Sequence, residues 1–376
     1  MRKIWAVALK EMRQIARDPL SLGMLLGVPA FMLLLYGYAL NFDVRHVPMA
    51  VQDRDNSTAS RDLVASFVNS TYFDRVRDLP AGADLERITE RRIAMAILVI
   101  PEEFGRDLAA GRTARIQILL DGTDANTANT ILGYASALVT EANIGIVGRA
   151  LARSGRSLEG AVRYSPRVWY NPELRTTNFL VPGLMGFIMM LTAVVSTALS
   201  VVREKERGTM EQLRVTSLHP GQLIAGKTLP YLGISLLASA IIVAAARFLF
   251  SVAVRGSYLD LFLATLVFLI GALGFGLLVS SFARSQAMAF QAGALLSMLP
   301  AIFLSGFIFP IRAMPAALQA LTYIFPTRYY LVVLRGVILK GAGLSPYWEQ
   351  MLFLVVYAAV VLGIAYARLA RDEAAA

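Results

Sequence analysis

A dense run of charges between two long apolar segments is the feature that most constrains this chain. Residues 203–214 read Arg-Glu-Lys-Glu-Arg-Gly-Thr-Met-Glu-Gln-Leu-Arg. The 24 residues before them, Phe179–Val202, carry no charge, and the run from Thr228 to about Val254 carries one arginine. Because a charged segment cannot lie in hydrocarbon, we expect the apolar runs to cross a membrane and the charged run to project into water.

The composition also predicts a polytopic α-helical membrane protein, since 56% of the 376 residues are hydrophobic and only 16% are charged. Six transmembrane helices are expected, at about Leu20–Leu40, Phe179–Val202, Thr228–Val254, Leu259–Phe282, Ala287–Phe309 and Tyr347–Ala367. The first resembles a retained signal anchor, because no small-residue cleavage site follows it.

The distribution of basic residues predicts the orientation. Short segments expected on the cytoplasmic side hold 13 Lys and Arg, and the short outer segments hold six. By the positive-inside rule both termini are predicted to be cytoplasmic. The net charge of +10 belongs entirely to the membrane part, because residues 41–178 hold 17 basic and 17 acidic side chains. Contact with anionic membrane lipid explains that excess, and no nucleic-acid partner is predicted.

Residues 1–41 are predicted to form an amphipathic elbow helix and the first span. The apolar side chains of Met1–Asp18 fall on one helical face: Ile4, Trp5, Ala8, Leu9, Met12 and Ile15. Such a helix lies in the headgroup layer, and Pro19 then turns the chain into the membrane.

Residues 42–172 are predicted to form an extracytoplasmic α/β domain. Short β-type runs are expected at Met49–Gln52, Ala94–Ile100 and Ile116–Leu120, and helices at Ser60–Asn69, Asp84–Arg91, Glu102–Ala110 and Asp124–Ala152. The remainder, 173–376, is predicted to hold the other five spans. Within it, residues 311–340 are interrupted by Pro326 and Arg328 and suit an outer re-entrant segment. The chain has no cysteine, which excludes thiolate chemistry and favours a bacterial inner-membrane protein.

No catalytic, cofactor or metal site is predicted. Residues Gly221–Thr228 match the pattern of a phosphate-binding loop, but Pro220 precedes them and a predicted span follows. Lys227 is interpreted as an interfacial anchor whose stem snorkels toward water. Away from the ends of the predicted spans only Arg247 is charged, whereas ion-coupled transporters carry buried carboxylates. Energy for transport would therefore come from another polypeptide.

Several motifs are spread over most of the chain. They are Lys10-Glu11 with Arg17–Pro19, Gln52–Ser57, Ile97–Pro101, Arg203–Leu213 with Gly226-Lys227, Ser305–Pro310 with Met314-Pro315, and Leu334–Gly336 with Leu339–Gly341. Together they resemble the ABC-2 class of ABC-transporter permeases, in the multidrug-efflux-like branch with a large external domain between the first two spans.

This resemblance implies a type V exporter-like fold and a permease subunit that dimerises. Separate cytoplasmic ATPase subunits would carry the ATP and Mg²⁺ and drive export of an amphiphile such as a drug or lipid. The implied ATPase-coupling helix spans 203–218, with Glu204, Lys205, Arg207, Gly208, Thr209, Glu211 and Gln212. The implied elbow residues are Lys10, Glu11, Arg17 and Asp18, and the outer gate or re-entrant residues are Ser305, Gly306, Phe307, Pro310 and Arg335.

Polar and flexible side chains on the second and fifth spans are candidates for a cargo path: Thr192, Ser196, Met190, Gln291, Ser297 and Met298. Helix packing in lipid uses the same residue types, so that interpretation stays open. Two other readings of the chain also remain. It could be a membrane-anchored envelope receptor or scaffold acting through its external domain, or an ATP-independent channel or secondary transporter. For the exporter, the external domain is expected to engage a periplasmic adaptor or the second permease.

Overall fold

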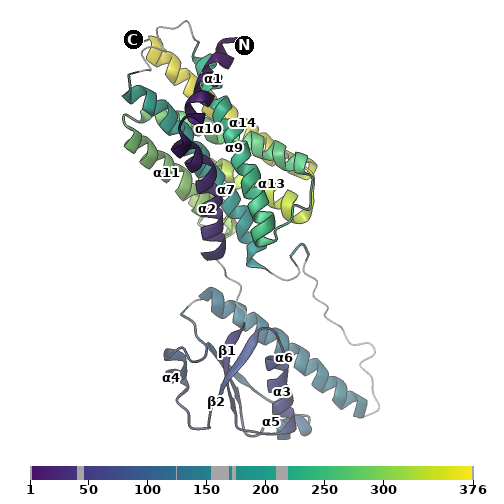
Figure 1. Ribbon diagram of the computed structural model, residues 1–376. Helices are drawn as coiled ribbons and strands as arrows, with labels where there is room; N and C mark the ends of the chain where they lie inside the picture. The colour runs from purple at the N-terminus through teal and green to yellow at the C-terminus, as the bar shows by residue number, and fades with distance from the viewer. Residues whose placement is uncertain are drawn as a thin grey trace. The chain divides into compact units, whose positions relative to one another are not determined.

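The computed structural model describes residues 2–39, 46–123, 125–153, 169–171, 175–208 and 219–374. The chain forms two compact units (Figure 1). One is helical and combines Met1–Asn41 with Arg167–Ala376, and the other comprises Phe42–Pro166. The sequence places the corresponding boundaries at 42 and 172.

The helical unit is built from long apolar helices. These are α2 (Pro19–Ala39), α7 (Thr176–Glu206), α9 (Pro220–Phe250), α10 (Tyr258–Phe282), α11 (Gln286–Phe303) and α14 (Trp348–Ala374), preceded by α1 (Arg2–Ala16). Among the described residues, five helices are long and apolar enough to cross a membrane: Thr176–Glu206, Pro220–Phe250, Tyr258–Phe282, Gln286–Phe303 and Ser345–Arg371. A shorter apolar stretch, Leu25–Ala39, lies in α2. The chain is therefore a multi-pass helical membrane protein.

The central helix of this unit is α7, which packs against α2, α9, α10, α11 and the short α13 (Pro326–Arg335). In its most apolar stretch 78% of the residues are buried, against 22% in α14. Close packing is possible because small residues face the neighbours. A Cβ added at Gly183 would lie 2.0 Å from the ring of Phe307, and one at Gly276 of α10 would lie 2.4 Å from Thr197.

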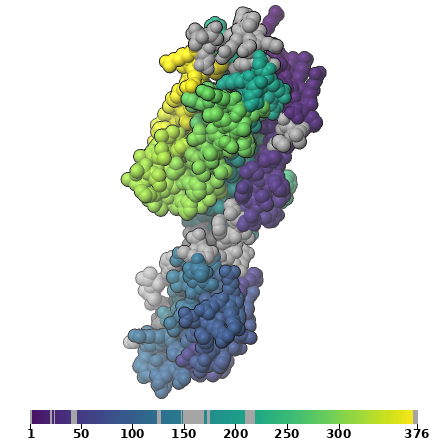
Figure 2. All heavy atoms as spheres, turned by 90° about the vertical axis from the view of Figure 1, so that its left-hand side faces the viewer, coloured from purple at the N-terminus to yellow at the C-terminus, as the bar shows by residue number. Residues whose placement is uncertain are grey.

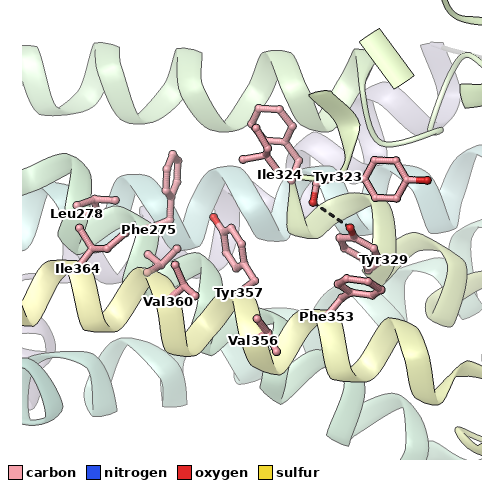
Figure 3. Close-up of a pocket in the computed structure, with 12 residues that line it drawn as sticks. Phe275, Leu278, Tyr323, Ile324, Tyr329, Phe353, Val356, Tyr357, Val360 and Ile364 are labelled. Carbon is pink, nitrogen blue, oxygen red and sulfur yellow. Dashed lines mark hydrogen bonds between the residues drawn. The ribbon is translucent and has the colours of Figure 1, made fainter. Parts of the chain in front are cut away.

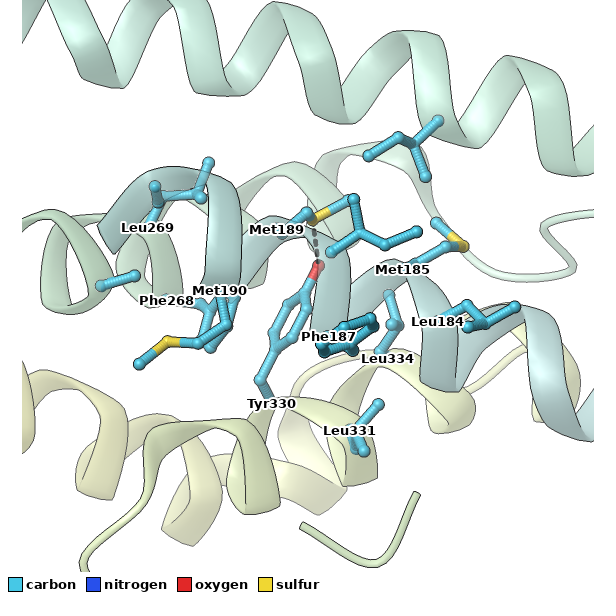
Figure 4. Packing of buried hydrophobic residues seen from close by; sticks show 14 of the residues in the cluster. Leu184, Met185, Phe187, Met189, Met190, Phe268, Leu269, Tyr330, Leu331 and Leu334 are labelled. Atoms are coloured by element: carbon cyan, nitrogen blue, oxygen red, sulfur yellow. Dashed lines mark hydrogen bonds between the residues drawn. The ribbon is translucent and has the colours of Figure 1, made fainter. Parts of the chain in front are cut away.

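Short helices connect α11 to α14. They are η1 (Ile311–Ala313), α12 (Ala316–Thr322), α13, the π-helical η2 (Gly336–Lys340) and η3 (Ser345–Tyr347). Tyr330 of α13 is fully buried in the core beside α7 (Figure 4). Its ring stacks on Phe268 at 4.0 Å between centroids, and its hydroxyl lies 2.9 Å from Thr265 Oγ1. Aromatic stacking and this hydrogen bond anchor the connecting segment in the helical core.

The α/β unit has a four-stranded sheet in the order β2-β1-β3-β4. Its strands are β1 (Val47–Asp53), β2 (Phe73–Asp78), β3 (Ala96–Ile100) and β4 (Gln117–Leu120), and its helices are α3 (Thr58–Val68), α4 (Leu85–Glu90), α5 (Phe104–Ala109) and α6 (Ala125–Arg153). β1 pairs in parallel with β2 and β3, and β4 is antiparallel to β3. Crossover helices are what parallel pairing requires.

Two features of the fold differ from the expectations. Strand β2 is not among the predicted strands, because it lies at the sheet edge and all its residues except Phe73 are exposed. Charged side chains are usual on an edge strand. The third long helix begins at Pro220 rather than Thr228, so the Gly221–Thr228 motif is part of that helix.

The N-terminal helices lie on the surface of the helical unit, in purple in Figure 2.

Candidate functional site

Four consecutive charged residues at the end of α7 contact other helices or the turn before α2. The sequence predicts a separate helix at 203–218. Its first residues instead belong to α7, which continues from the predicted span through Glu206. Arg207 caps the helix, and Gly208 has φ of 69°, a left-handed conformation that glycine adopts without strain. Thr209, Glu211 and Gln212 lie outside the described residues.

Glu204 belongs to a group of four charges, here called the ion cluster: Lys10, Glu11, Glu204 and Lys227, of which only Lys10 is exposed. Lys227 Nζ lies 2.5 Å from Glu204 Oε2 and 3.0 Å from Glu11 Oε1. Lys10 Nζ donates to Glu204 and lies 3.4 Å from Glu11 Oε1. The exposed fractions are 2% for Lys227, 3% for Glu11 and 4% for Glu204. The cluster thus joins α1, α7 and α9.

Local sequence explains how these elements approach so closely. The buried face of α1 consists of Val7, Ala8, Glu11 and Ile15, which are one helical turn apart or adjacent. Gly226 of α9 faces this helix, and a Cβ there would lie 2.6 Å from Val7 Cβ. Glycine before Lys227 therefore lets α1 come near enough for the lysine to reach Glu11.

The charges of the ion cluster balance, which makes their burial tolerable. Moving an isolated charge from water into a protein interior costs several kcal/mol, and only well-placed partners offset that cost. Burial lowers the pKa of Lys10, but the hydrogen bond and charge of Glu204 and the charge of Glu11 outweigh it and raise that pKa above the ordinary 10.5. The two lysines and two glutamates then sum to zero.

The two residues after Glu204 stabilise the ends of other helices. Lys205 Nζ donates to the carbonyl of Ser280 at 2.7 Å, near the C-terminus of α10. Glu206 Oε1 accepts the backbone N–H of Gln286 at 2.7 Å, at the start of α11. A cation at a helix C-terminus and an anion at an N-terminus satisfy unpaired backbone groups and the helix dipole.

Arg203 contacts both α11 and the turn between α1 and α2. Its Nε donates to Gln286 Oε1 at 3.3 Å, and its Nη1 lies 3.7 Å from Asp18 Oδ2. The end of α7 is therefore connected to α1, α9, α10, α11 and the start of α2. The sequence suggested that these charges are exposed for docking. In the structure, Glu204 instead points into the protein, and Lys205 points toward a neighbouring helix.

The expectation that Lys227 snorkels toward water is wrong. It lies inside α9, and its ammonium group is buried between two carboxylates. The structure brings together Lys10 and Glu11 with Glu204, and Asp18 with Arg203, whereas Arg17 is exposed. One sequence signal could have revealed the cluster: an acid, Glu11, lies among the apolar residues of an amphipathic helix and so requires a basic partner.

The motif that matches a phosphate-binding loop has no loop geometry. Its residues lie in α9, and the backbone N–H groups of Gln222 and Leu223 already donate to the carbonyl of His219. A phosphate-binding loop instead presents free N–H groups ahead of a helix.

A groove of about 460 Å³ begins beside the ion cluster and follows α7 between α2 and α11. Its polar end contains Gln14, Asp18, Ser200 and Arg203, and Tyr231 of α9 also lines it. Its walls are apolar, with Leu25, Val28 and Met32 of α2, Leu191, Val195 and Leu199 of α7, and Phe290 and Ala294 of α11. The groove is therefore polar at one end and apolar along its walls, which matches the distribution of polar and apolar groups in an amphiphile.

The groove separates the candidate path residues into two groups. Thr192, Ser196 and Met298 line it. Met190 and Ser297 are buried elsewhere, at 2% and 1% exposure, and Gln291 is exposed outside it. The hydroxyls of Thr192 and Ser196 donate to carbonyls of their own helix at 2.8 and 2.9 Å. Each hydroxyl oxygen can therefore only accept a hydrogen bond from a ligand.

A second groove, of about 380 Å³, lies between α10, α14 and the segment around α12 and α13 (Figure 3). Its lining consists of apolar and aromatic residues, among them Phe275, Tyr329, Phe353 and Tyr357. The Tyr329 hydroxyl donates to the carbonyl of Tyr323 at 2.9 Å. This groove has no charged side chain in its lining.

The predicted outer residues gather around Arg335 of α13. Its Nη1 donates to the Gly306 carbonyl at 3.0 Å, and its Nη2 to the carbonyls of Phe307 and Phe179 at 3.3 and 3.4 Å. Ser305 Oγ accepts the N–H of Phe307 at 3.2 Å. Pro310 precedes η1. Arg335 thus fixes the loop after α11 to the start of α7.

Comparisons with known proteins agree with this architecture along the whole chain. The model of the ABC-2 family transporter proteins matches residues 20–367. The chain is 33% identical over 371 residues to "Probable multidrug ABC transporter permease YbhS" of Escherichia coli (strain K12), covering 98% of this chain and 97% of that protein. It is 29% identical over 369 residues to "Probable multidrug ABC transporter permease YbhR" of the same organism, covering 98% of each. It is 20% identical over 379 residues to "Linearmycin resistance permease protein LnrN" of Bacillus subtilis (strain 168), covering 96% of this chain and 97% of that protein. The chain therefore belongs to the ABC-2 family of transporter proteins and is a permease subunit of an ABC transporter.

Proposed function

We propose that this permease is the membrane subunit of an ATP-driven exporter, that separate cytoplasmic ATPase subunits energise it, and that its cargo is an amphiphile. The observation that carries the proposal is the arrangement at the end of α7. The charged residues there connect the middle of α1 with the ends of α9, α10 and α11 beside the segment that joins two predicted spans. Movement of that segment by an ATPase would reach every one of these helices.

The groove along α7 supports an amphiphilic cargo. It offers charged and hydroxyl groups at the end near Arg203 and apolar walls along α2 and α11. Drug-sized ligands commonly bind in apolar pockets with a few placed polar groups. The names of the relatives, which refer to multidrug transport and linearmycin resistance, agree with such a cargo.

The proposed topology has six spans and places both termini in the cytoplasm of a bacterial inner membrane. α2 supplies the sixth span: its 21 residues extend about 31 Å, close to the thickness of the hydrocarbon core. A second permease subunit would complete the pathway. The α/β unit would then lie outside, available to a periplasmic adaptor or to the matching unit of the second subunit.

Transport into inside-out vesicles tests the proposal. Vesicles containing the permease and its co-purified ATPase subunits should accumulate an amphiphilic fluorescent dye when ATP is added. Ser196→Trp should fill the groove and reduce initial uptake by about tenfold or more, because hydrophobic recognition depends on close fit. The matched control is Val355→Trp, at an exposed position of α14 that lines neither groove.

The alternatives predict different results. Absence of any co-purifying ATPase would favour the receptor or scaffold function. Dye uptake that needs an ion gradient but no ATP would favour a secondary transporter. Equal uptake by the Ser196 and Val355 variants would remove the groove from the cargo path.

A further inference from the structure

We infer that the ion cluster is a rigid joint, in which Glu11 and Lys227 are positioning residues that make α1 and α2 follow the segment between α7 and α9. The inference rests on the proposed function, because it assumes that an ATPase moves that segment. It adds that the N-terminal helix transmits the movement to the groove.

The joint holds both ends of the segment. Glu204 lies two residues before the end of α7 at Glu206, and Lys227 lies in the second turn of α9, which starts at Pro220. Both bind the same turn of α1, at Lys10 and Glu11. A displacement of either helix end must therefore carry α1 with it or separate buried opposite charges.

The physical costs favour carrying α1. Separating Lys227 from Glu11 would take one charged partner from each of two side chains that are only 2% and 3% exposed, and breaking a buried ion pair is destabilising. The opposite face of α1 is held less tightly, because Trp5, Leu9 and Met12 are exposed by 68%, 37% and 42%. An amphipathic helix with such a face can move within the membrane interface.

The movement has a short path from α1 to the groove. Only Arg17 and Asp18 separate the end of α1 at Ala16 from the start of α2 at Pro19. Backbone hydrogen bonds hold the chain on both sides of Pro19, with the Arg17 N–H donating to the Arg13 carbonyl and the Leu22 N–H to the Asp18 carbonyl, at 3.1 and 3.0 Å. Arg203 also contacts Asp18. α2 then contributes Leu25, Val28 and Met32 to the groove wall.

One side chain belongs to both the joint and the groove. Ser200 lines the polar end of the groove, and its Oγ donates to Glu11 Oε2 at 3.4 Å. A change in the position of Glu11 would therefore alter the groove directly, at Ser200, as well as through α2. Charge pairs have a defined geometry, so they fix the register of α1 on α9 in a way that apolar contacts alone do not.

The test uses the full complex of permease and ATPase subunits in proteoliposomes. Glu11→Gln keeps the shape of the side chain and removes its charge. We expect the ATPase subunits to stay bound and basal ATP hydrolysis to stay within about twofold of that of the unmodified complex. The amount of dye exported per ATP hydrolysed should fall about tenfold, which lies within the range of measured coupling energies between distant sites. Arg17→Gln, at an exposed position just after the same helix, should change neither quantity.

Rescue separates positioning from simple destabilisation. The exchanged pair Glu11→Lys with Lys227→Glu restores one salt bridge in the reverse direction, and we expect it to recover part of the export per ATP that each single variant loses. Unchanged export per ATP in Glu11→Gln would overturn the inference. So would a loss that merely follows the amount of folded complex.

A distance measurement tests the joint independently of export. Spin labels on cysteines at Arg13 and Arg207, both exposed, should keep their separation when a non-hydrolysable ATP analogue binds. Labels at Arg207 and Ala367 should change theirs, and Glu11→Gln should make the first pair change as well. A shift of the first pair in the unmodified protein would contradict the joint. A lack of ATP-dependent export by the unmodified complex would instead contradict the proposed function.

Discussion

Lys227 Nζ lies 3.0 Å from Glu11 Oε1, although 216 residues separate them in the chain. This pair explains a motif that the sequence alone renders ambiguous. Gly226-Lys227 completes the pattern of a phosphate-binding loop, yet here the glycine makes room for α1 and the lysine binds a carboxylate of that helix. The same residue types serve phosphate binding elsewhere because glycine permits close approach and lysine carries a mobile positive charge.

Gly226→Ala should destabilise the protein. The added Cβ would lie 2.6 Å from Val7 Cβ and 3.1 Å from the carbonyl oxygen of Ile4, so α1 must move away from α9, at a cost of about 1–3 kcal/mol. The control is Gly233→Ala in the same helix, where nothing lies within 4 Å of an added Cβ. Alanine there should be neutral or stabilising. Thermal unfolding in detergent checks both, and equal midpoints for the two variants would contradict the close contact.

The second prediction concerns the energetic coupling of Glu11 and Lys227. Glu11→Gln and Lys227→Met should each reduce the free energy of unfolding by about 3 kcal/mol, because each removes one charge from the balanced ion cluster and leaves an uncompensated charge among buried groups. The double variant should lose clearly less than the sum, since one neutral side chain then faces another. A double-mutant cycle from denaturation curves measures this coupling. Strict additivity would show that the two groups do not interact.

How far the sequence predicts this fold depends on the range of the interactions. The expected span Leu259–Phe282 differs from α10 by one residue at its start, because a long apolar run in lipid can only become a helix. The edge strand β2 was missed because its exposed sequence, Phe-Asp-Arg-Val-Arg-Asp, has no apolar alternation. The joining of α1, α7 and α9 could not be read from any local pattern, since it depends on contacts about two hundred residues apart.

The site was predictable only in part for the same reason. The charged run after Val202 and the Lys10-Glu11 pair stood out as sequence features, but nothing in the sequence showed that they bind each other. Thr192 and Ser297 are both hydroxyl residues on apolar helices, yet only Thr192 lines the groove, and Ser297 is 1% exposed. Which face of each helix is buried is decided by its neighbours in space.

The third prediction concerns pH. The pKa of Lys10 is raised above its ordinary value of 10.5, so the stabilisation that this charge provides is fully present below that value and is lost as the pH rises through the higher folded-state pKa. The difference in melting temperature between the unmodified protein and Lys10→Met should therefore stay constant from about pH 6 to about pH 9 and shrink only at higher pH. A difference that already disappears near neutral pH would contradict pairing of Lys10 with Glu204 and Glu11.

The fourth prediction tests the proposed topology. Because the chain has no cysteine, single cysteines report on their own surroundings. Cysteines at Gly82 and Ser345, both exposed, should react in intact cells with a thiol reagent that cannot cross the membrane. A cysteine at the exposed Arg207 should react only after the cells are opened. Labelling of Arg207→Cys in intact cells would invert the orientation that the basic residues predict.

The last prediction concerns the α/β unit. It has its own core, in which residues such as Phe67, Phe73 and Leu98 are at most 1% exposed, and it is far larger than a connection between two spans needs to be. Replacing residues 45–170 with a short flexible linker should therefore leave the helical unit folded and basal ATP hydrolysis by the complex intact. Export should be lost, because a folded insertion of this size usually binds a partner. Dye transport in whole cells and ATP hydrolysis by the purified complex measure the two effects separately. If export survives the replacement while the linker variant is present at normal levels, cargo leaves through the helical unit without help from the α/β unit.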